Sequence, residues 1–328
     1  MHLLNFGIYI ELNGELTIKH KLYDVIFFAS KTKSKTNLII NNIFQKTHEQ
    51  FLANNINSKV MIITDWTKDT NCKVSIGLGG IKPFSKRGWM IKKIILHQKT
   101  QGNRHIIVDG GYIYKRNKYW SVGWDNLNGR ADFQNKNSDD SRIKKWNIIL
   151  APWKFNKSGY VLFCLQLPWD ASVYYSEYSE YIEKTIDSLL KATNRDIVIR
   201  EHPLINKGGF SKLSLTHKYK EIVAKSLKLK KIYKSSEKHI KKDFNKSWCV
   251  VSFNSNSTVE ATILGIPSFV ADKGSMTWDI SSHNLDVENL KTPDRQQWLN
   301  NISYAQWHEK EIISGEPFKQ LGLKKIIS

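Results

Sequence analysis

Short apolar runs alternate along this chain with longer stretches in which apolar residues recur at helical spacing. Such runs predict buried strands, and the helical spacing predicts helices that bury one face. The predicted strands span residues 60–64, 74–78, 105–108, 160–165, 196–199, 231–233, 248–253 and 268–271. The predicted helices span residues 87–98, 174–192, 220–229, 257–264 and 293–307. The polar region 115–145 gives no clear prediction.

Strands that alternate with helices through short connections predict parallel sheets flanked by helices. The chain has 328 residues, enough for two domains of about 150 residues each. We place the boundary near residue 157, within Asn156-Lys157-Ser158-Gly159. The expected fold class is α/β, with an N-terminal domain over residues 1–157, a C-terminal domain over residues 158–328 and a cleft between their sheets. The terminal helix is the element that would cross back to the first domain.

The composition supports a packed core, since 41% of residues are hydrophobic and 24% are charged. The net charge is +20, a field that attracts polyanions such as nucleic acid, anionic lipid or acidic glycan. The chain is also rich in Lys, Asn and Ile, so a compositional bias on a solvated surface explains the charge equally well. The 11 Trp and 13 Tyr residues suit either core packing or stacking on rings and bases.

The cysteines Cys72, Cys164 and Cys249 lie far apart in sequence and show no CxxC spacing. They are expected to be buried, unpaired residues of a reduced compartment. No basic leader with a long apolar stretch stands at the start, and no segment reaches the ~18 apolar residues that a membrane span needs. The expected location is cytoplasmic, where contact with an anionic membrane surface stays possible.

The segment 250–261 contains a buried strand, a turn rich in Ser and Asn, and the start of a helix. Ligands of open α/β sheets bind at the carboxyl ends of strands, and the start of a helix attracts phosphate. Hydroxyls at Ser252, Ser255 and Ser257 would add donors. The same spacing also fits a capping box with Ser257 at the N-cap and Glu260 at N3, and from spacing alone the cap is favoured.

Three further segments stand at predicted strand ends. Arg200-Glu201-His202-Pro203 offers Arg and His to a phosphate, or is a solvated strand end. Asp109-Gly110-Gly111 places a carboxylate beside small residues, as a general base needs, or is an Asp-Gly turn. Gln166-Leu167-Pro168-Trp169-Asp170-Ala171-Ser172 would face the same cleft.

Taken in order, these segments resemble the bacterial capsule-polysaccharide Kdo-transferase family. The resemblance covers roughly residues 75 to 280 and rests on the order and spacing of short motifs. The segments are Gly79-Gly80-Ile81-Lys82-Pro83, Asp109-Gly110-Gly111-Tyr112, residues 166–172, residues 200–203, and the Ser/Asn turn with Glu260-Ala261 and Gly265-Ile266-Pro267. The resemblance implies an inverting enzyme of the GT-B fold, which has two Rossmann-like domains.

The resemblance also implies roles for single residues. Asp109 matches the motif where the base is expected, although Val108 replaces the family's Glu. His202, Ser255, Ser257 and Glu260 match donor-nucleotide positions, and Gln166 and Asp170 would lie at the domain junction near the donor. With Arg200, Ser252 and Asn256 beside them, these are the expected donor-binding residues. The stretch 119–133 is only loosely similar, but its residue types suit an acceptor or sugar pocket, and Asp125 and Asp132 are rival bases. The expected pocket residues are Gly80, Lys82, Tyr112, Trp120, Trp124, Asp125, Arg130 and Asp132.

The sequence thus favours an inverting glycosyltransferase that uses a UDP- or CMP-linked sugar, with no cofactor and no metal, since no Asp-x-Asp triplet occurs. The expected acceptor is a hydroxylated base in DNA, because lysine and arginine contact phosphates and Trp120 and Trp124 would stack on a flipped base. One alternative acceptor is a capsule or envelope polysaccharide. An alternative of another class is a non-catalytic nucleic-acid-binding protein on a degenerate transferase fold.

Overall fold

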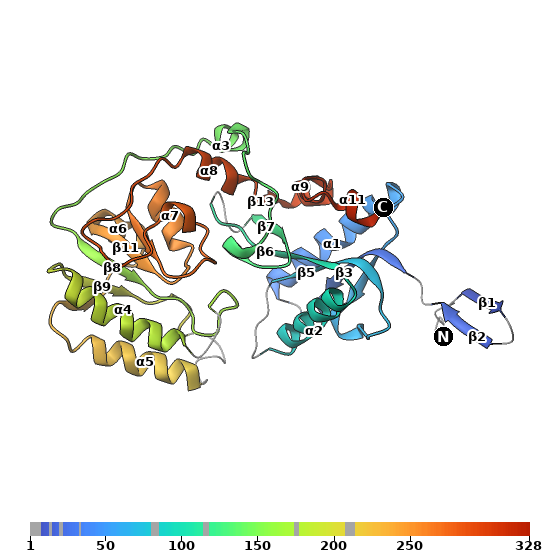
Figure 1. The fold of residues 1–328 in the computed structure, drawn as a ribbon, viewed down its shortest axis with the longest axis horizontal. Helices are drawn as coiled ribbons and strands as arrows, with labels where there is room; N and C mark the ends of the chain where they lie inside the picture. Colours follow the sequence, from blue (N-terminus) through green and yellow to red (C-terminus); the bar gives the residue numbers. More distant parts are fainter. Residues whose placement is uncertain are drawn as a thin grey trace.

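The computed structural model describes residues 8–12, 15–19, 22–32, 34–79, 85–113, 118–173, 177–206 and 214–328. Figure 1 shows two α/β lobes side by side, with the C-terminus lying on the lobe that the N-terminal half forms. Strands β1 (Ile8–Leu12) and β2 (Glu15–Lys19) form a separate antiparallel pair. Within the described ranges, none of the helices has the length and hydropathy needed to cross a bilayer.

The first domain is built on a six-stranded sheet of order β13-β7-β6-β5-β3-β4, in which β7 and β13 run antiparallel to their neighbours. Successive side chains of a strand point to opposite faces. Val25 and Phe27 of β3 therefore pack with helix α1, whereas Ile26 and Phe28 pack with α2. The bounds are β3 (Tyr23–Ala29), α1 (Lys35–Ala53), β4 (Ser58–Ile62), β5 (Cys72–Leu78), α2 (Lys86–Thr100), β6 (Arg104–Gly110), β7 (Tyr119–Trp124) and α3 (Ser141–Trp146).

The second domain has a five-stranded parallel sheet of order β10-β9-β8-β11-β12. The strand order reverses between β8 and β11, which is the switch point where open α/β sheets bind ligands. Helices α4 and α5 cover one face, and α6 and α7 cover the other. The bounds are β8 (Tyr160–Cys164), α4 (Tyr178–Ala192), β9 (Ile197–Arg200), α5 (Ser214–Ser226), β10 (Ile232–Lys234), α6 (Ile240–Lys246), β11 (Ser247–Ser252), α7 (Ser257–Ile263) and β12 (Ser268–Val270).

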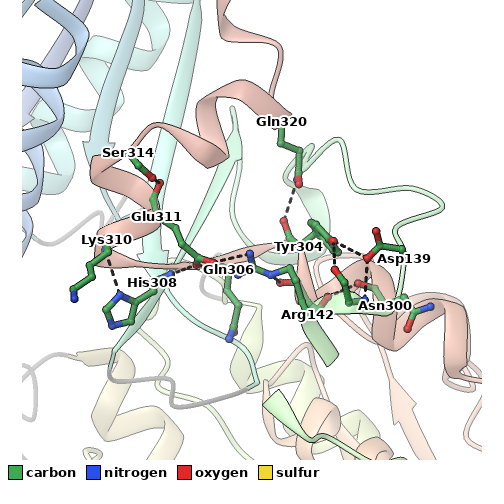
Figure 2. A network of polar contacts seen from close by, with 12 residues as sticks. Asp139, Arg142, Asn300, Tyr304, Gln306, His308, Lys310, Glu311, Ser314 and Gln320 are labelled. Atoms are coloured by element: carbon green, nitrogen blue, oxygen red, sulfur yellow. Dashed lines mark hydrogen bonds and ion pairs between the residues drawn. The ribbon is translucent and has the colours of Figure 1, made fainter. Parts of the chain in front are cut away.

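The last residues of the chain return to the first domain. After α8, strand β13 pairs with β7, and three short helices add Phe318 and Leu323 to the core formed by β3, β5 and α1. Figure 2 shows Arg142 of α3 beside this returning segment, where it donates to the Gln306 carbonyl and the Glu311 carboxylate. The bounds are α8 (Gln296–Ser303), β13 (Gln306–His308), α9 (Glu309–Ile313), α10 (Glu316–Gln320) and α11 (Leu323–Ile327).

The α/β class with two domains and parallel strands at each core is confirmed, and the three cysteines are buried and unpaired. Two helix predictions need correction. The predicted helix 293–307 is the shorter α8 followed by strand β13, because Gln306 and its neighbours pair with β7. The predicted helix 220–229 ends at Ser226, the last residue of α5. Of the predicted helix 174–192, residues 174–176 lie outside the described part.

Candidate functional site

A cavity of about 460 Å³ lies between the two domains, at the carboxyl ends of β8, β9 and β11 and opposite the end of β6. Its volume falls within the ~300–1,000 Å³ typical of small-molecule sites. We call it the first cavity. From the first domain it is lined by Asp109, Gly110, Gly111 and Asn128. From the second domain it is lined by Cys164, Leu165, Gln166, Leu167, Asp170, Ser172, Arg200, Glu201, His202, Pro203, Ile240, Asn254, Ser255, Asn256, Ser257 and Glu260.

The turn between β11 and α7 is held by its own serine hydroxyls. The Ser252 hydroxyl accepts from the Ser255 amide at 3.1 Å, and the Ser255 hydroxyl accepts from the Ser257 amide at 3.2 Å. Asn256 is the N-cap of α7 and makes no side-chain cap bond, so the predicted capping box from Ser257 to Glu260 is wrong. Ser252 is fully buried and supports the turn without lining the cavity.

Two oxygens of this turn lack a conventional partner among the described residues. They are Asn256 Oδ1 and Ser257 Oγ, both buried, and the Ser257 hydroxyl has only the Cys164 thiol, a weak hydrogen-bonding group, beside it. Leaving a buried polar atom unpaired costs about 1–3 kcal/mol. Both residues line the first cavity, so a bound ligand would satisfy these groups.

The floor of the first cavity is a reciprocal amide pair. Gln166 Nε2 donates to Asn254 Oδ1 at 2.8 Å, and the backbone N–H of Asn254 donates to Gln166 Oε1 at 3.0 Å. The pair joins the ends of β8 and β11 at the switch point. Asp170 accepts from both the amide and the hydroxyl of Ser172, at 2.9 Å each, which fixes its carboxylate at the cavity wall.

The side chains of Arg200 and His202 have different surroundings. Arg200 Nη1 donates to Asp243 at 2.5 Å and to the Glu237 carbonyl at 2.8 Å, so the guanidinium holds the segment before α6. Arg200 also lines the first cavity, so its role as a phosphate ligand stays a prediction. His202 Nδ1 accepts from the Leu204 amide at 3.2 Å, so the proton of the neutral ring sits on Nε2, which is a donor.

Asp109 lies near the end of β6, on the opposite wall, and lines a second cavity as well. A Cβ at Gly110 would meet no atom within 4 Å, so the strand end is open at this residue. Burial lowers the pKa of Arg87, which the charge of Asp109 partly offsets. The second cavity has a volume of about 690 Å³ and is lined by Ser34, Lys35, Thr36, Asn37, Ile39, Leu78, Gly79, Ser85, Arg87, Gly88, Ile91, Asp109, Gly110, Trp120, Asp170 and Ala171.

The expected acceptor residues are only partly brought together. Gly80 and Lys82 lie outside the described residues. Because β7 runs antiparallel to β6, Trp120 pairs with Gly110 at the cleft and lines the second cavity, whereas Trp124 pairs with Ile106 further from it.

Five further expectations for the acceptor pocket are corrected, because none of these residues lines either cavity. Trp124 and Tyr112 are 1% exposed and belong to cores. Asp125 binds Arg104 at 2.8 Å, and Asp132 accepts from Gln134. Arg130 forms a fork with Asp272 of the second domain.

Several lining residues were not predicted, among them Asn254, Asn128 and Arg87. Asn254 stands inside the Ser/Asn turn, so its place after a buried strand was a usable signal. Arg87 carries no such signal, since it is an ordinary polar residue in the first turn of α2. The role of Arg87 depends on how α2 packs, which local sequence does not encode.

No protein-family model and no curated protein matches this chain. Among solved structures it is similar to Thermosulfurimonas dismutans KpsC, a beta Kdo 2,7 transferase, with a TM-score of 0.49 and 10% identity over 92% of this chain and 99% of that chain. S. aureus MnaA in a UDP co-structure has a TM-score of 0.34 and 11% identity, covering 92% and 97%. Methanocaldococcus jannaschii UDP-GlcNAc 2-epimerase has a TM-score of 0.32 and 13% identity, covering 84% and 97%.

Proposed function

We propose that this protein is a glycosyltransferase that moves a sugar from a nucleotide-sugar donor to an acceptor hydroxyl. The observation that carries the proposal is the position of Asp109, which lines two adjoining cavities. A transferase with two substrates needs a base where the acceptor meets the donor. The first cavity is the proposed donor site and the second is the proposed acceptor site.

The donor site offers hydrogen-bond donors for a leaving nucleotide phosphate. His202 Nε2–H and the Ser257 hydroxyl stand on the wall of the second domain, and Glu260 lines the same wall. Fixed donors stabilise the charge that develops on the leaving group. UDP- and CMP-linked sugars both suit this wall. We propose that these donors serve in place of a metal ion, so that activity persists in a chelator.

The proposed reaction is a single inverting displacement. Asp109 takes the proton of the acceptor hydroxyl as its oxygen forms a bond to the anomeric carbon. The bond from that carbon to the nucleotide phosphate oxygen breaks, and the phosphate leaves as an anion beside His202. Inversion follows because the acceptor enters from the side opposite the leaving group.

For the acceptor we propose a saccharide of the capsule or envelope type. The second cavity has hydroxyl and amide side chains at Ser34, Thr36 and Asn37, and one aromatic surface at Trp120, which suits a sugar ring. One of the two aromatic residues expected to stack on a flipped DNA base is excluded, because Trp124 is 1% exposed in the core. A net charge of +20 still attracts any polyanion, so DNA is tested alongside.

The test is turnover of a panel of UDP-, CMP- and GDP-sugars, with and without acceptor saccharides or duplex DNA that carries hydroxymethylated bases. Asp109→Asn is expected to lower transfer by about 10²–10⁴-fold while nucleotide affinity is retained. Full activity of that variant would remove Asp109 as the base. Release of no sugar from any donor would favour the non-catalytic alternative, and transfer to DNA alone would replace the saccharide acceptor.

A further inference from the structure

Two loops of different domains meet beside the first cavity. One is the short helix η2 (Asn128–Arg130) of the first domain, and the other is residues 272–275 of the second. The Gly129 amide donates to the Gly274 carbonyl at 3.0 Å. A Cβ at Gly129 would overlap the Ser275 carbonyl, and one at Gly274 would overlap Arg130 Nη1. The two backbones are therefore in direct contact.

A forked ion pair joins the same loops. Arg130 Nη1 and Nη2 donate to Asp272 Oδ1 and Oδ2 at 2.7 and 2.5 Å. The Asp272 side chain is 14% exposed. Burial raises the pKa of Asp272, but the hydrogen bonds from Arg130 and Asn254 outweigh it and hold the pKa below its usual value. A bidentate pair with one partly buried member fixes orientation as well as distance.

The ion pair continues into the floor of the first cavity. Asn254 Nδ2 donates to Asp272 Oδ1 at 2.8 Å and to the Ser172 carbonyl at 2.7 Å. The other polar groups of Asn254 form the reciprocal pair with Gln166. Asn254 is 2% exposed, so its four hydrogen bonds leave it little freedom. A continuous chain of hydrogen bonds thus runs from Arg130 to Gln166.

We infer that Arg130 is a positioning residue, which through Asp272 and Asn254 orders the donor-binding wall of the second domain when the first domain docks against it. Arg130 itself lines neither cavity. Its effect on a nucleotide in the first cavity must therefore pass through the hydrogen-bonded chain. This inference rests on the proposed donor site.

The chain offers a matched control pair. Arg195 donates from Nε and Nη2 to Glu288 at 3.0 and 3.2 Å, which is also a forked ion pair of the second domain. Arg195 and Glu288 line a different cavity with Lys157 and Asn194, away from the amide pair. Arg195→Ala therefore removes a forked ion pair, together with the Arg195 Nη1 bonds to the Lys157 and Gly159 carbonyls, without touching the floor of the first cavity.

The experiment compares the full-length wild type with Arg130→Ala, Arg130→Lys and Arg195→Ala. Calorimetric titration with UDP and with CMP gives the nucleotide affinity. Hydrogen exchange of the Asn254 backbone amide in the free protein measures how firmly its bond to Gln166 is held. Arg130→Ala is expected to weaken nucleotide binding by about 3- to 30-fold and to speed that exchange. Arg130→Lys restores only part of both effects, because an ammonium cannot form the fork. Arg195→Ala changes neither measurement.

Unchanged exchange at Asn254 in a folded Arg130→Ala protein would overturn the inference, whatever the nucleotide result. Equal losses of affinity in Arg130→Ala and Arg195→Ala would also overturn it, because a general loss of stability would then explain both. Failure of the wild type to bind either nucleotide counts against the proposed function instead. In that case the exchange measurement alone decides the inference.

Discussion

His105 is a buried histidine of β6, four residues before the proposed base, and its Nδ1 lies 2.6 Å from the Ser75 hydroxyl. Burial lowers the pKa of His105 from 6.5 to about 4, against a smaller opposing effect of Asp125. Between these pH values the unfolded chain binds a proton that the folded protein does not. The free energy of unfolding should therefore fall as pH drops from about 6.5 to 4, by about 3 kcal/mol from this group, and change little from it below that.

Urea unfolding across this pH range checks the prediction, with His105→Gln as the control. The variant loses the titrating group, so the part of the pH slope that His105 supplies should disappear. An identical slope in both proteins would show that His105 titrates alike when folded and unfolded.

Gly265 follows α7 at a φ of +80°, and a Cβ there would overlap the Pro152 carbonyl. Both the left-handed backbone and the contact oppose a side chain. Gly265→Ala should lower the free energy of unfolding by about 2–4 kcal/mol. Gly315 is the matched control, since its φ is +90° and no atom lies within 4 Å of its Cβ position. Gly315→Ala should cost only about 1 kcal/mol, and equal costs in thermal unfolding would contradict a steric effect at Gly265.

At the scale of elements, the crossing of the C-terminal segment depends on Arg142 of α3. Besides the two contacts in Figure 2, its Nε donates to the Ser303 carbonyl at 3.0 Å, and its guanidinium lies 4.3 Å from the Trp307 ring centroid. Arg142→Ala removes the ion pair of the Glu311 carboxylate, which is mostly buried. We expect a loss of about 3 kcal/mol in the free energy of unfolding, measured by denaturant titration. Arg142→Lys should recover less than half of the lost free energy of unfolding. Full recovery would show that the two parallel bonds from the guanidinium to Glu311 are unimportant.

Strands with strong local signals were predictable, and those defined by tertiary contacts were not. The runs at β8, β9 and β11 are apolar and buried, so composition alone located them. β13 has three residues and exists because β7 offers an unpaired edge, which no local pattern reveals. The run of β3, with its buried Phe27, carries the same signal as the predicted strands but is missing from them.

At the scale of the whole molecule, most of the predicted donor-site residues converge on the first cavity, because the rule that selected them was geometric. The carboxyl ends of parallel strands meet at one edge of a sheet, so residues after β8, β9 and β11 had to converge. Most of the expected acceptor residues were taken from 119–133 as one segment, but β7 runs antiparallel and carries Trp124 away from the cleft. Strand direction depends on pairing, and pairing depends on the complete fold.

The two domains are not two halves of the sequence, and this has a measurable consequence. Residues after Ser303 add a strand to the first sheet, and Phe318 packs edge-on against Phe27 and Phe51 at 6.4 and 5.2 Å. Gln306 Oε1 also accepts from the Tyr112 and Ile113 amides at 2.6 and 2.9 Å. A chain ending at Ser303 should therefore lose cooperative unfolding of the first domain, while the second domain keeps its parallel sheet.

Hydrogen exchange followed strand by strand measures this difference, because loss of protection should be confined to β3, β5, β6 and β7. The control is a chain that begins at residue 22, since β1 and β2 pair only with each other among the described strands. It removes 21 residues where the first truncation removes 25, and should keep the protection of both sheets. A peptide of residues 304–328 added to the shortened chain should restore the first domain, since the segment acts by packing. Full protection without that peptide would mean that β7 tolerates an open edge and that the first 303 residues suffice for both cores.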